Sequence, residues 1–299
     1  MTHLATTTEP AHAMPKGHAG FPQLVRSEWT KLRSIRSTWI CLALVVVLSI
    51  AFAIIFPAAI ADHWSRRPLA DKLTYDPVSI TQFGVIFSQL VVGVLGAMAI
   101  TAEYSTGSIR TTLTSVPRRS TLVAAKAVVL AVVVFIVAEI TTFASFMVGR
   151  SILLAFGGKE LPVGSSLLTQ IHSSAIPVVS LSSPGVTGAI FRGGLYLTLI
   201  ALVSLGIGLL LRSTAGSISL FVGIFLIVPL LMQALPSSIS HPIEPKLPSN
   251  LGAAMTSTHA RATEFGGTLL HPWSATVLLA VYGLALIALG TWSFIKRDA

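Results

Sequence analysis

An all-α integral membrane protein with six transmembrane helices is the fold that the amino-acid sequence predicts. Of the 299 residues, 53% are hydrophobic and only 10% are charged, whereas soluble domains carry roughly 25% charged residues. The mean hydropathy is +0.80, and several apolar runs reach the length of about 20 residues that crosses a hydrocarbon core of about 30 Å. These observations exclude a soluble enzyme, a secreted module and a fully disordered chain.

The net charge of +9 does not indicate nucleic-acid binding, because a basic excess on an apolar chain is typical of loops that hold the membrane topology. The single cysteine, Cys41, lies inside an apolar run, which excludes an intrachain disulfide and the C-x-x-C spacing of metal sites. We expect no metal site. The first apolar run begins at Trp39, behind a polar stretch too long for the n-region of a cleaved signal peptide, so we expect this span to be retained.

Two segments are predicted before the first span. Residues 1–20 mix Thr, Ala, Pro, Gly and His without periodicity, a composition typical of a disordered tail. Residues 21–38 predict an interfacial amphipathic helix, because an apolar stripe repeats at helical spacing and basic residues fall away from it, toward anionic lipid. Glu28 falls within the stripe, so an irregular linker whose charges only set the orientation is the alternative. The stripe consists of Val25, Trp29, Leu32 and Ile35, and the basic residues are Arg26, Lys31 and Arg33.

Residues 39–299 predict a six-helix transmembrane domain. The apolar runs are about twice as long as the roughly ten alternating residues of a barrel strand, so they predict helices. The third span carries charged residues, Lys126 near its start and Glu139 well inside, whereas the other five carry none. The predicted spans are 39–60, 80–100, 122–148, 193–211, 213–235 and 276–295.

The distribution of Lys and Arg predicts the orientation. With both termini in the cytoplasm, 12 of the 20 basic residues fall on the inner side and eight are spread over the longer outer loops. The positive-inside rule therefore favours a multi-pass protein of the cell membrane with both termini cytoplasmic, which agrees with an even number of spans.

The inner loop between the second and third spans predicts a short amphipathic helix over 108–116. Gly107 breaks the incoming helix, Ser108 can cap the new one, and Pro117 ends it. A rigid helix held between two membrane helices can pass force from a soluble partner to the membrane. From the residues alone, a capped inside loop that only obeys the charge rule is an equal alternative. The apolar face of this helix consists of Ile109, Leu113 and Val116.

Residues 103–119, EYSTGSIRTTLTSVPRR, resemble a pattern found in the permease subunits of type-two ATP-binding-cassette (ABC) exporters, especially actinobacterial ones. The RSEWTKLRS stretch at 26–34, the RSTAG stretch at 212–216 and the LPSN stretch at 247–250 are also similar to that group. The resemblance covers about 21–299 and leaves the N-terminal tail outside.

The resemblance implies a transmembrane permease subunit that pairs with a second permease subunit, identical or different, and with two cytoplasmic ABC ATPase subunits. The helix at 108–116 would be the coupling helix seated in a groove of the ATPase, and the helix at 23–37 would line the same docking region. The coupling helix and its flanks would be Glu103, Gly107, Ile109, Arg110, Leu113, Pro117, Arg118 and Arg119, and the interfacial helix would contribute Glu28, Trp29, Lys31, Leu32 and Arg33.

The chain contains no G-x-x-x-x-G-K-[ST] phosphate-binding loop, and its nearest approach, GGKE at 157–160, lacks the first glycine at the required spacing. We therefore expect a transporter subunit that is not an enzyme and has no catalytic residues. It would bind no cofactor itself, and ATP and Mg²⁺ would bind to the partner ATPase.

Glu139 is a candidate functional residue because ionisable groups inside a membrane are costly. It would face the translocation path or a subunit interface, or it would form local hydrogen bonds near Thr141, Thr142 and Ser145. Two other functions therefore stay open: a proton-coupled secondary carrier that uses Glu139, and a non-transporting membrane scaffold. The sequence does not identify the substrate.

Overall fold

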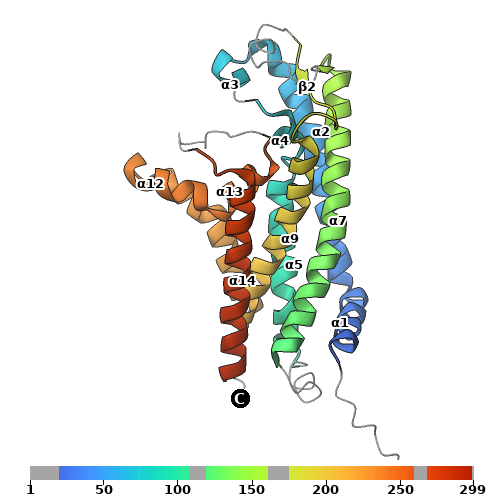
Figure 1. The fold of residues 1–299 in the computed structure, drawn as a ribbon, viewed down its shortest axis with the longest axis vertical. Coiled ribbons are helices and arrows are strands. Elements are labelled where there is room, and N and C mark those ends of the chain that lie inside the picture. Colours follow the sequence, from blue (N-terminus) through green and yellow to red (C-terminus); the bar gives the residue numbers. More distant parts are fainter. Residues whose placement is uncertain (1–19, 74, 108–118, 161–174, 259–267, 298–299) are drawn as a thin grey trace, which may run out of the picture.

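The computed structural model describes residues 20–73, 75–107, 119–160, 175–258 and 268–297. In this part of the chain the protein is a bundle of long helices that run side by side (Figure 1). Helix α1 (Phe21–Ser34) and the C-terminal end of the last helix lie at one end of the bundle, and α3 (Leu69–Leu73) lies at the other.

Six helices in the described residues are long and apolar enough to cross a membrane, which confirms the number of spans expected from the sequence. Helices suit this role because each one satisfies its own backbone hydrogen bonds in the absence of water. The six are α2 (Arg36–His63) with η1 (Trp64–Arg66), α5 (Val85–Ser105), α7 (Arg119–Ala155), α9 (Val186–Leu211), α10 (Thr214–Val222) continued by η2 (Gly223–Ile227) and α11 (Val228–Met232), and α14 (Pro272–Arg297).

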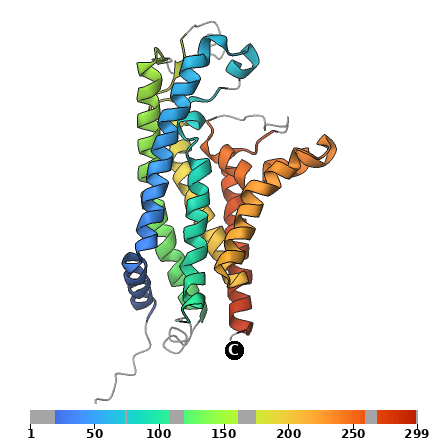
Figure 2. The same ribbon diagram turned by 180° about the vertical axis from the view of Figure 1, so that it is seen from behind.

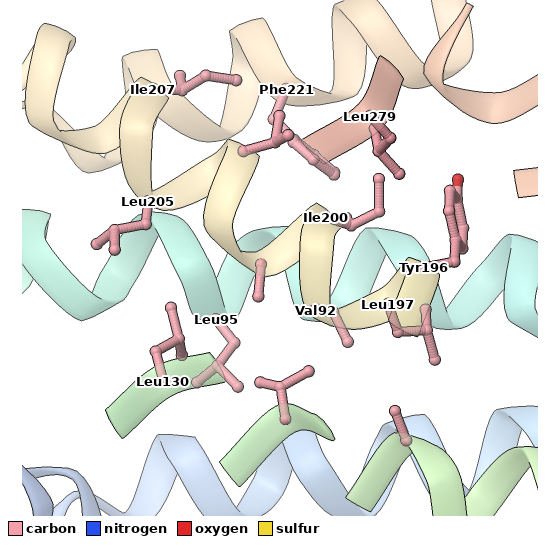
Figure 3. Packing of buried hydrophobic residues seen from close by; sticks show 14 of the residues in the cluster. Val92, Leu95, Leu130, Tyr196, Leu197, Ile200, Leu205, Ile207, Phe221 and Leu279 are labelled. Carbon is pink, nitrogen blue, oxygen red and sulfur yellow. The ribbon is translucent and has the colours of Figure 1, made fainter. Parts of the chain in front are cut away.

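Helix α9 is the centre of the bundle. It packs against α5, α7 and α14, and Figure 3 shows its Ile200 among side chains of the neighbouring helices, including Leu95 of α5 and Leu279 of α14. The close approach depends on glycines. A Cβ atom added at Gly96 of α5 would lie only 2.3 Å from the Ala201 carbonyl oxygen of α9.

The second span begins five residues later than the sequence suggested. Asp76 caps the short helix α4 (Pro77–Thr81), because its carboxylate accepts hydrogen bonds from the backbone N–H groups of Val78 and Ser79. The chain then turns through 82–84 before α5 starts at Val85. The apolar composition of this stretch hid the turn, since hydropathy does not distinguish a short capped helix from the start of a long one.

The fifth span is interrupted near the proline that the sequence shows at 229. A π-helical turn, η2, precedes Pro229, and the Val228 N–H bonds the Gly223 carbonyl five residues earlier. Pro229 has no N–H to donate, so a local change of helical pitch at this point is the expected accommodation. Pro57, in contrast, lies inside the continuous helix α2.

Short elements cover the end of the bundle that lies away from α1. Helix α12 (Ser237–Ile243) projects outward (Figure 2), and η3 (Glu244–Lys246) leads into α13 (Pro248–Thr256), which packs against α9 and α14. Strands β1 (Lys159–Glu160) and β2 (Pro177–Val178) form one parallel pair in which Lys159 lies opposite Pro177. An ion pair between Arg150 and Glu160 connects β1 to α7.

We predict that Gly96→Ala destabilises the bundle by about 1–3 kcal/mol, because the added methyl group has no space against the α9 backbone. The measurement is thermal unfolding of the purified protein in detergent. Gly283→Ala is the matched control, since this buried glycine of α14 also faces α9 but leaves 3.7 Å to the nearest atom. Equal unfolding temperatures for the two variants would contradict the close-packing account.

Candidate functional site

Three helices meet at the α1 end of the bundle. Leu24 of α1 packs against Leu122 and Ala125 of α7 in a small buried cluster, and the end of α5 lies alongside. This apolar contact fixes α1 on the start of the third span. It also brings the ionisable groups of three helices together in a site that is partly shielded from solvent.

Four of these groups form a closed set of ion pairs, here called the ion ring: Glu28 and Lys31 of α1, Glu103 of α5 and Lys126 of α7. The Lys126 ammonium lies 2.6 Å from one Glu28 oxygen and 2.8 Å from Glu103 Oε1. The Lys31 ammonium lies 2.8 Å from the other Glu28 oxygen and 3.2 Å from Glu103 Oε1. Each carboxylate therefore contacts both ammonium groups, and the ring has no formal net charge.

Burial makes this arrangement energetically important. The side chains of Glu28 and Lys126 are only 3% and 8% exposed, so either charge would be costly to leave alone. Burial raises the pKa of Glu28, but Lys126 and Lys31 outweigh that effect and hold its pKa below the ordinary value of 4.5. For Lys31, burial lowers the pKa, but Glu28 and Glu103 outweigh it and raise the pKa above 10.5.

The buried face of α1 differs from the predicted apolar stripe. Trp29 and Ile35 are exposed, whereas Glu28 is buried and Lys31 points toward the bundle. The expectation that Lys31 lies on an outward basic face is therefore wrong, and Glu28 is part of the contact surface. The physical reason is the pairing with Lys126 and Glu103, which periodicity of apolar residues does not register. Leu32 is half-buried and Arg33 is exposed.

In the sequence, the predicted coupling helix comes directly after the end of α5, which contributes Glu103 to this site. Gly107 ends α5 with φ of 71°, a left-handed conformation that favours glycine. Ile109, Arg110, Leu113, Pro117 and Arg118 lie outside the described residues, so the structure does not test the helix expected at 108–116. In the sequence, Glu103 of the ion ring lies four residues before Gly107, and Lys126 of the ion ring lies seven residues after Arg119.

Two arginines connect the same end of the bundle to the C-terminal end of α14. The Arg119 guanidinium lies 3.5 and 3.4 Å from the carbonyl oxygens of Phe294 and Ile295. Arg212, in the turn between α9 and α10, donates to the Ser293 carbonyl at 3.1 Å and lies over the Tyr104 ring. Cations near the last carbonyls of a helix are favourable, because those groups carry the negative end of the helix dipole. The role of Arg212 was not anticipated from the sequence.

A cavity of about 440 Å³ lies beside the ion ring. Its wall includes Glu28 and Lys126 on one side and apolar residues such as Leu95 and Met98 on the other. The cavity separates part of α1 from the membrane helices. The ion ring therefore connects these helices beside an open space and does not lie in a packed core.

Glu139 is half-buried and lies against α9. A Cβ atom added at Gly194 would lie 2.5 Å from its carboxyl group, and Glu139 Oε1 has no hydrogen-bond partner among the described residues. The Thr141 and Thr142 hydroxyl groups donate to backbone carbonyls, of Val137 and Glu139, and not to this carboxylate. Among the described residues, neither threonine therefore satisfies the buried Oε1 atom of Glu139.

We predict that Lys126→Met destabilises the protein by about 3–5 kcal/mol, because it leaves a buried carboxylate of Glu28 without its nearest partner. Thermal or denaturant unfolding in detergent measures this loss. Lys159→Met is the control, since Lys159 is an exposed lysine of β1, beyond the far end of α7. An equally small effect of both substitutions would show that the ring contributes little to stability.

We also predict a loss of stability in acid that depends on Glu28. Its pKa in the folded protein lies below the unfolded value of 4.5, so its contribution is complete above that pH and is lost as the pH falls through the lower, folded pKa. Unfolding temperatures measured from neutral pH down to about pH 3 should fall less steeply for Glu28→Gln than for the unaltered protein. Parallel curves would contradict this assignment.

Comparison with known proteins places these features in a family. The family model described as ABC-2 family transporter protein matches residues 24–203, more than half of the chain. A search of curated proteins gives no significant match. The matched region begins in α1, includes all four residues of the ion ring and continues through most of α9. With six apolar helices beside this match, the chain is a multi-pass membrane protein that belongs to the ABC-2 transporter family.

Proposed function

We propose that the chain is the permease subunit of an ATP-driven exporter in the cell membrane, and that it couples ATP hydrolysis by a separate ATPase to movement of a substrate. The observation that carries the proposal is the ion ring. It joins the interfacial helix α1 to the end of the second span and the start of the third, on both sides of the predicted coupling segment.

This arrangement supports a mechanical role. A cytoplasmic ATPase that moves the segment at 108–118 would pull on Glu103 and on the start of α7 together, because the two are connected through Lys126. Helix α1 would move with them through Glu28. These helix ends would have two positions and would move between them together. An ATPase that binds one of the two positions more tightly would shift the equilibrium toward it.

The remaining parts of the proposal follow from the family. The permease would act with a second permease subunit, identical or different, and with two ATPase subunits that bind ATP and Mg²⁺. The chain itself would have no ATPase activity. Both termini would be cytoplasmic, and the location of α1 and the end of α14 at the same end of the bundle supports this orientation (Figure 1).

A proton-coupled carrier is the second candidate, and the observation that favours it is the buried Oε1 atom of Glu139, which has no hydrogen-bond partner among the residues that the structure describes. A carrier of this kind would transport without an ATPase and would lose transport in Glu139→Gln. A scaffold would show neither property. Association with an ATPase therefore separates the exporter from both alternatives.

We predict that a tagged form of the chain, expressed in its native membrane, co-purifies with an ATPase that contains a G-x-x-x-x-G-K-[ST] loop. Arg110→Glu combined with Gly107→Pro should lower the recovered ATPase by about tenfold or more, because like charges across an interface cost several kcal/mol. Immunoblotting for the chain and mass spectrometry of the eluate measure the ratio.

The control is Arg66→Glu, the same charge reversal at an exposed position on the opposite end of α2. It should leave the ATPase ratio unchanged. Absence of any ATPase from the unaltered complex would refute the exporter, and equal loss in both charge-reversal variants would refute the proposed docking segment.

A further inference from the structure

A second and larger cavity, of about 900 Å³, lies at the end of the membrane helices opposite to the ion ring. The later half of α2, the start of α5, the α11 region and α13 form its walls, and Tyr196 of α9 lies in the wall between them. It is here called the Gln82 cavity. Its size is that of cavities that hold small organic ligands, roughly 300–1,000 Å³.

One side of the Gln82 cavity is aromatic and apolar. Phe56 of α2 stacks on Phe83 with ring centroids 3.7 Å apart, and Phe87 continues the same surface along α5. Leu226 and Leu230 form part of the facing wall and are more than half exposed. In the single subunit those two side chains are open to the outside of the bundle, so a molecule dissolved in the bilayer has a route into the cavity where lipid reaches this face.

The polar side of the cavity has unsatisfied hydrogen-bonding groups. Gln82 is only 2% exposed, yet neither its amide nitrogen nor its amide oxygen has a partner within the described residues. Gly193 of α9 lets this side chain approach, since a Cβ atom there would lie 2.7 Å from Gln82 Oε1. The Ser249 hydroxyl is likewise unpartnered in this part of the chain. A buried amide without partners costs about 1–3 kcal/mol, so a ligand that bonds it gains affinity.

A second glutamine in the same wall provides an internal comparison. The Gln89 amide oxygen accepts a hydrogen bond from the Tyr196 hydroxyl, which fixes both side chains. Of the three glutamines that line the cavity, Gln89 is therefore satisfied by the protein, Gln233 is exposed, and Gln82 is buried without a partner among the described residues.

The charged residues in the cavity wall indicate which charge a ligand would carry. No Asp or Glu occurs among the described residues that line the cavity, so an organic cation would have no counter-ion there. Among the described residues of this wall, Arg67 and His63 are the basic groups, and the phenol of Tyr196 is the remaining titratable group. A sulfonate or carboxylate could meet Arg67, but it only accepts hydrogen bonds, whereas Gln82 offers both a donor and an acceptor. A neutral amide or hydroxyl group can satisfy both functions of Gln82.

We propose that the Gln82 cavity binds an uncharged amphipathic molecule, whose hydrocarbon part lies against the Phe56–Phe83 wall and whose amide or hydroxyl group bonds Gln82. The proposed exporter would release this molecule on the side of the membrane opposite to the ATPase. Only that last assignment rests on the proposed function, because binding itself requires neither an ATPase nor ATP.

The test is binding of tritium-labelled dodecanamide to the full chain in phosphatidylcholine nanodiscs, with empty nanodiscs as the reference for partition into lipid. We expect saturable binding that excess dodecanamide displaces. Dodecyltrimethylammonium and dodecanesulfonate, which keep the hydrocarbon chain and carry permanent charges, should displace it at least about tenfold less effectively, as expected when a buried hydrogen-bonding group is left unpaired.

Two variants locate the site. Gln82→Leu keeps the size of the side chain and removes the amide, and it should weaken dodecanamide binding at least about tenfold. Gln23→Leu, at an exposed glutamine of α1, should bind as the unaltered chain does. Ala253→Phe fills the cavity from an exposed position of α13 and should abolish binding without loss of folding, as checked by the thermal unfolding temperature.

The outcomes are distinct. Equal binding by the unaltered chain and Gln82→Leu, tighter binding of the trimethylammonium compound, or no saturable binding at all would each overturn the proposal. If dodecanamide binding is saturable and depends on Gln82, but no ATPase co-purifies with the chain, the binding site in the cavity is supported and the exporter is refuted. If an ATPase co-purifies but dodecanamide does not bind, the exporter is supported and the binding site is refuted.

Discussion

Close packing around α9 is the constraint on which the rest of the structure depends. In a bilayer, apolar side chains gain little by leaving lipid for protein, so helices associate through van der Waals contact and hydrogen bonds at short range. Gly96 lets α5 approach the α9 backbone, and Gly206 faces Leu286 of α14 at a distance that no side chain at that position would permit. The positions of α5, α7 and α14 relative to one another follow from their contacts with this one helix.

The ion ring works on a different principle, because it connects helix ends without filling the space between them. The four groups balance in charge, and two of them are nearly fully buried. Such a ring strongly favours one arrangement of α1, α5 and α7, since a displaced helix would leave an uncompensated charge behind. The neighbouring cavity beside Leu95 and Met98 lies between α1 and the ends of α5 and α7, so packing does not fill the space between these helices. The ion ring is therefore a main contact that fixes how the three helix ends lie relative to one another.

Much of the fold could be predicted from the sequence, since hydropathy alone identifies six apolar helices. The boundaries were less predictable where local hydrogen bonds decide them, as with the Asp76 cap before α5. In the site, Glu28, Lys31 and Glu103 were identified as candidates, but their common contact was not, because pairing with Lys126 depends on how three helices meet. Gln82 carried no sequence signal at all. Its importance comes from missing partners in three dimensions, which no spacing rule registers.

The length of helix α7 determines how its two ends can move. It runs without interruption through 37 residues, about 55 Å at 1.5 Å per residue and thus well beyond a hydrocarbon core of about 30 Å. Lys126 lies near one end and Arg150 near the other. A continuous helix of this length tilts as a lever, so a sideways displacement of the Lys126 end about a pivot within the bilayer is accompanied by an opposite displacement of the Arg150 end. One rigid rod can thus narrow the bundle on one face of the membrane while widening it on the other, with no change in its own hydrogen bonds.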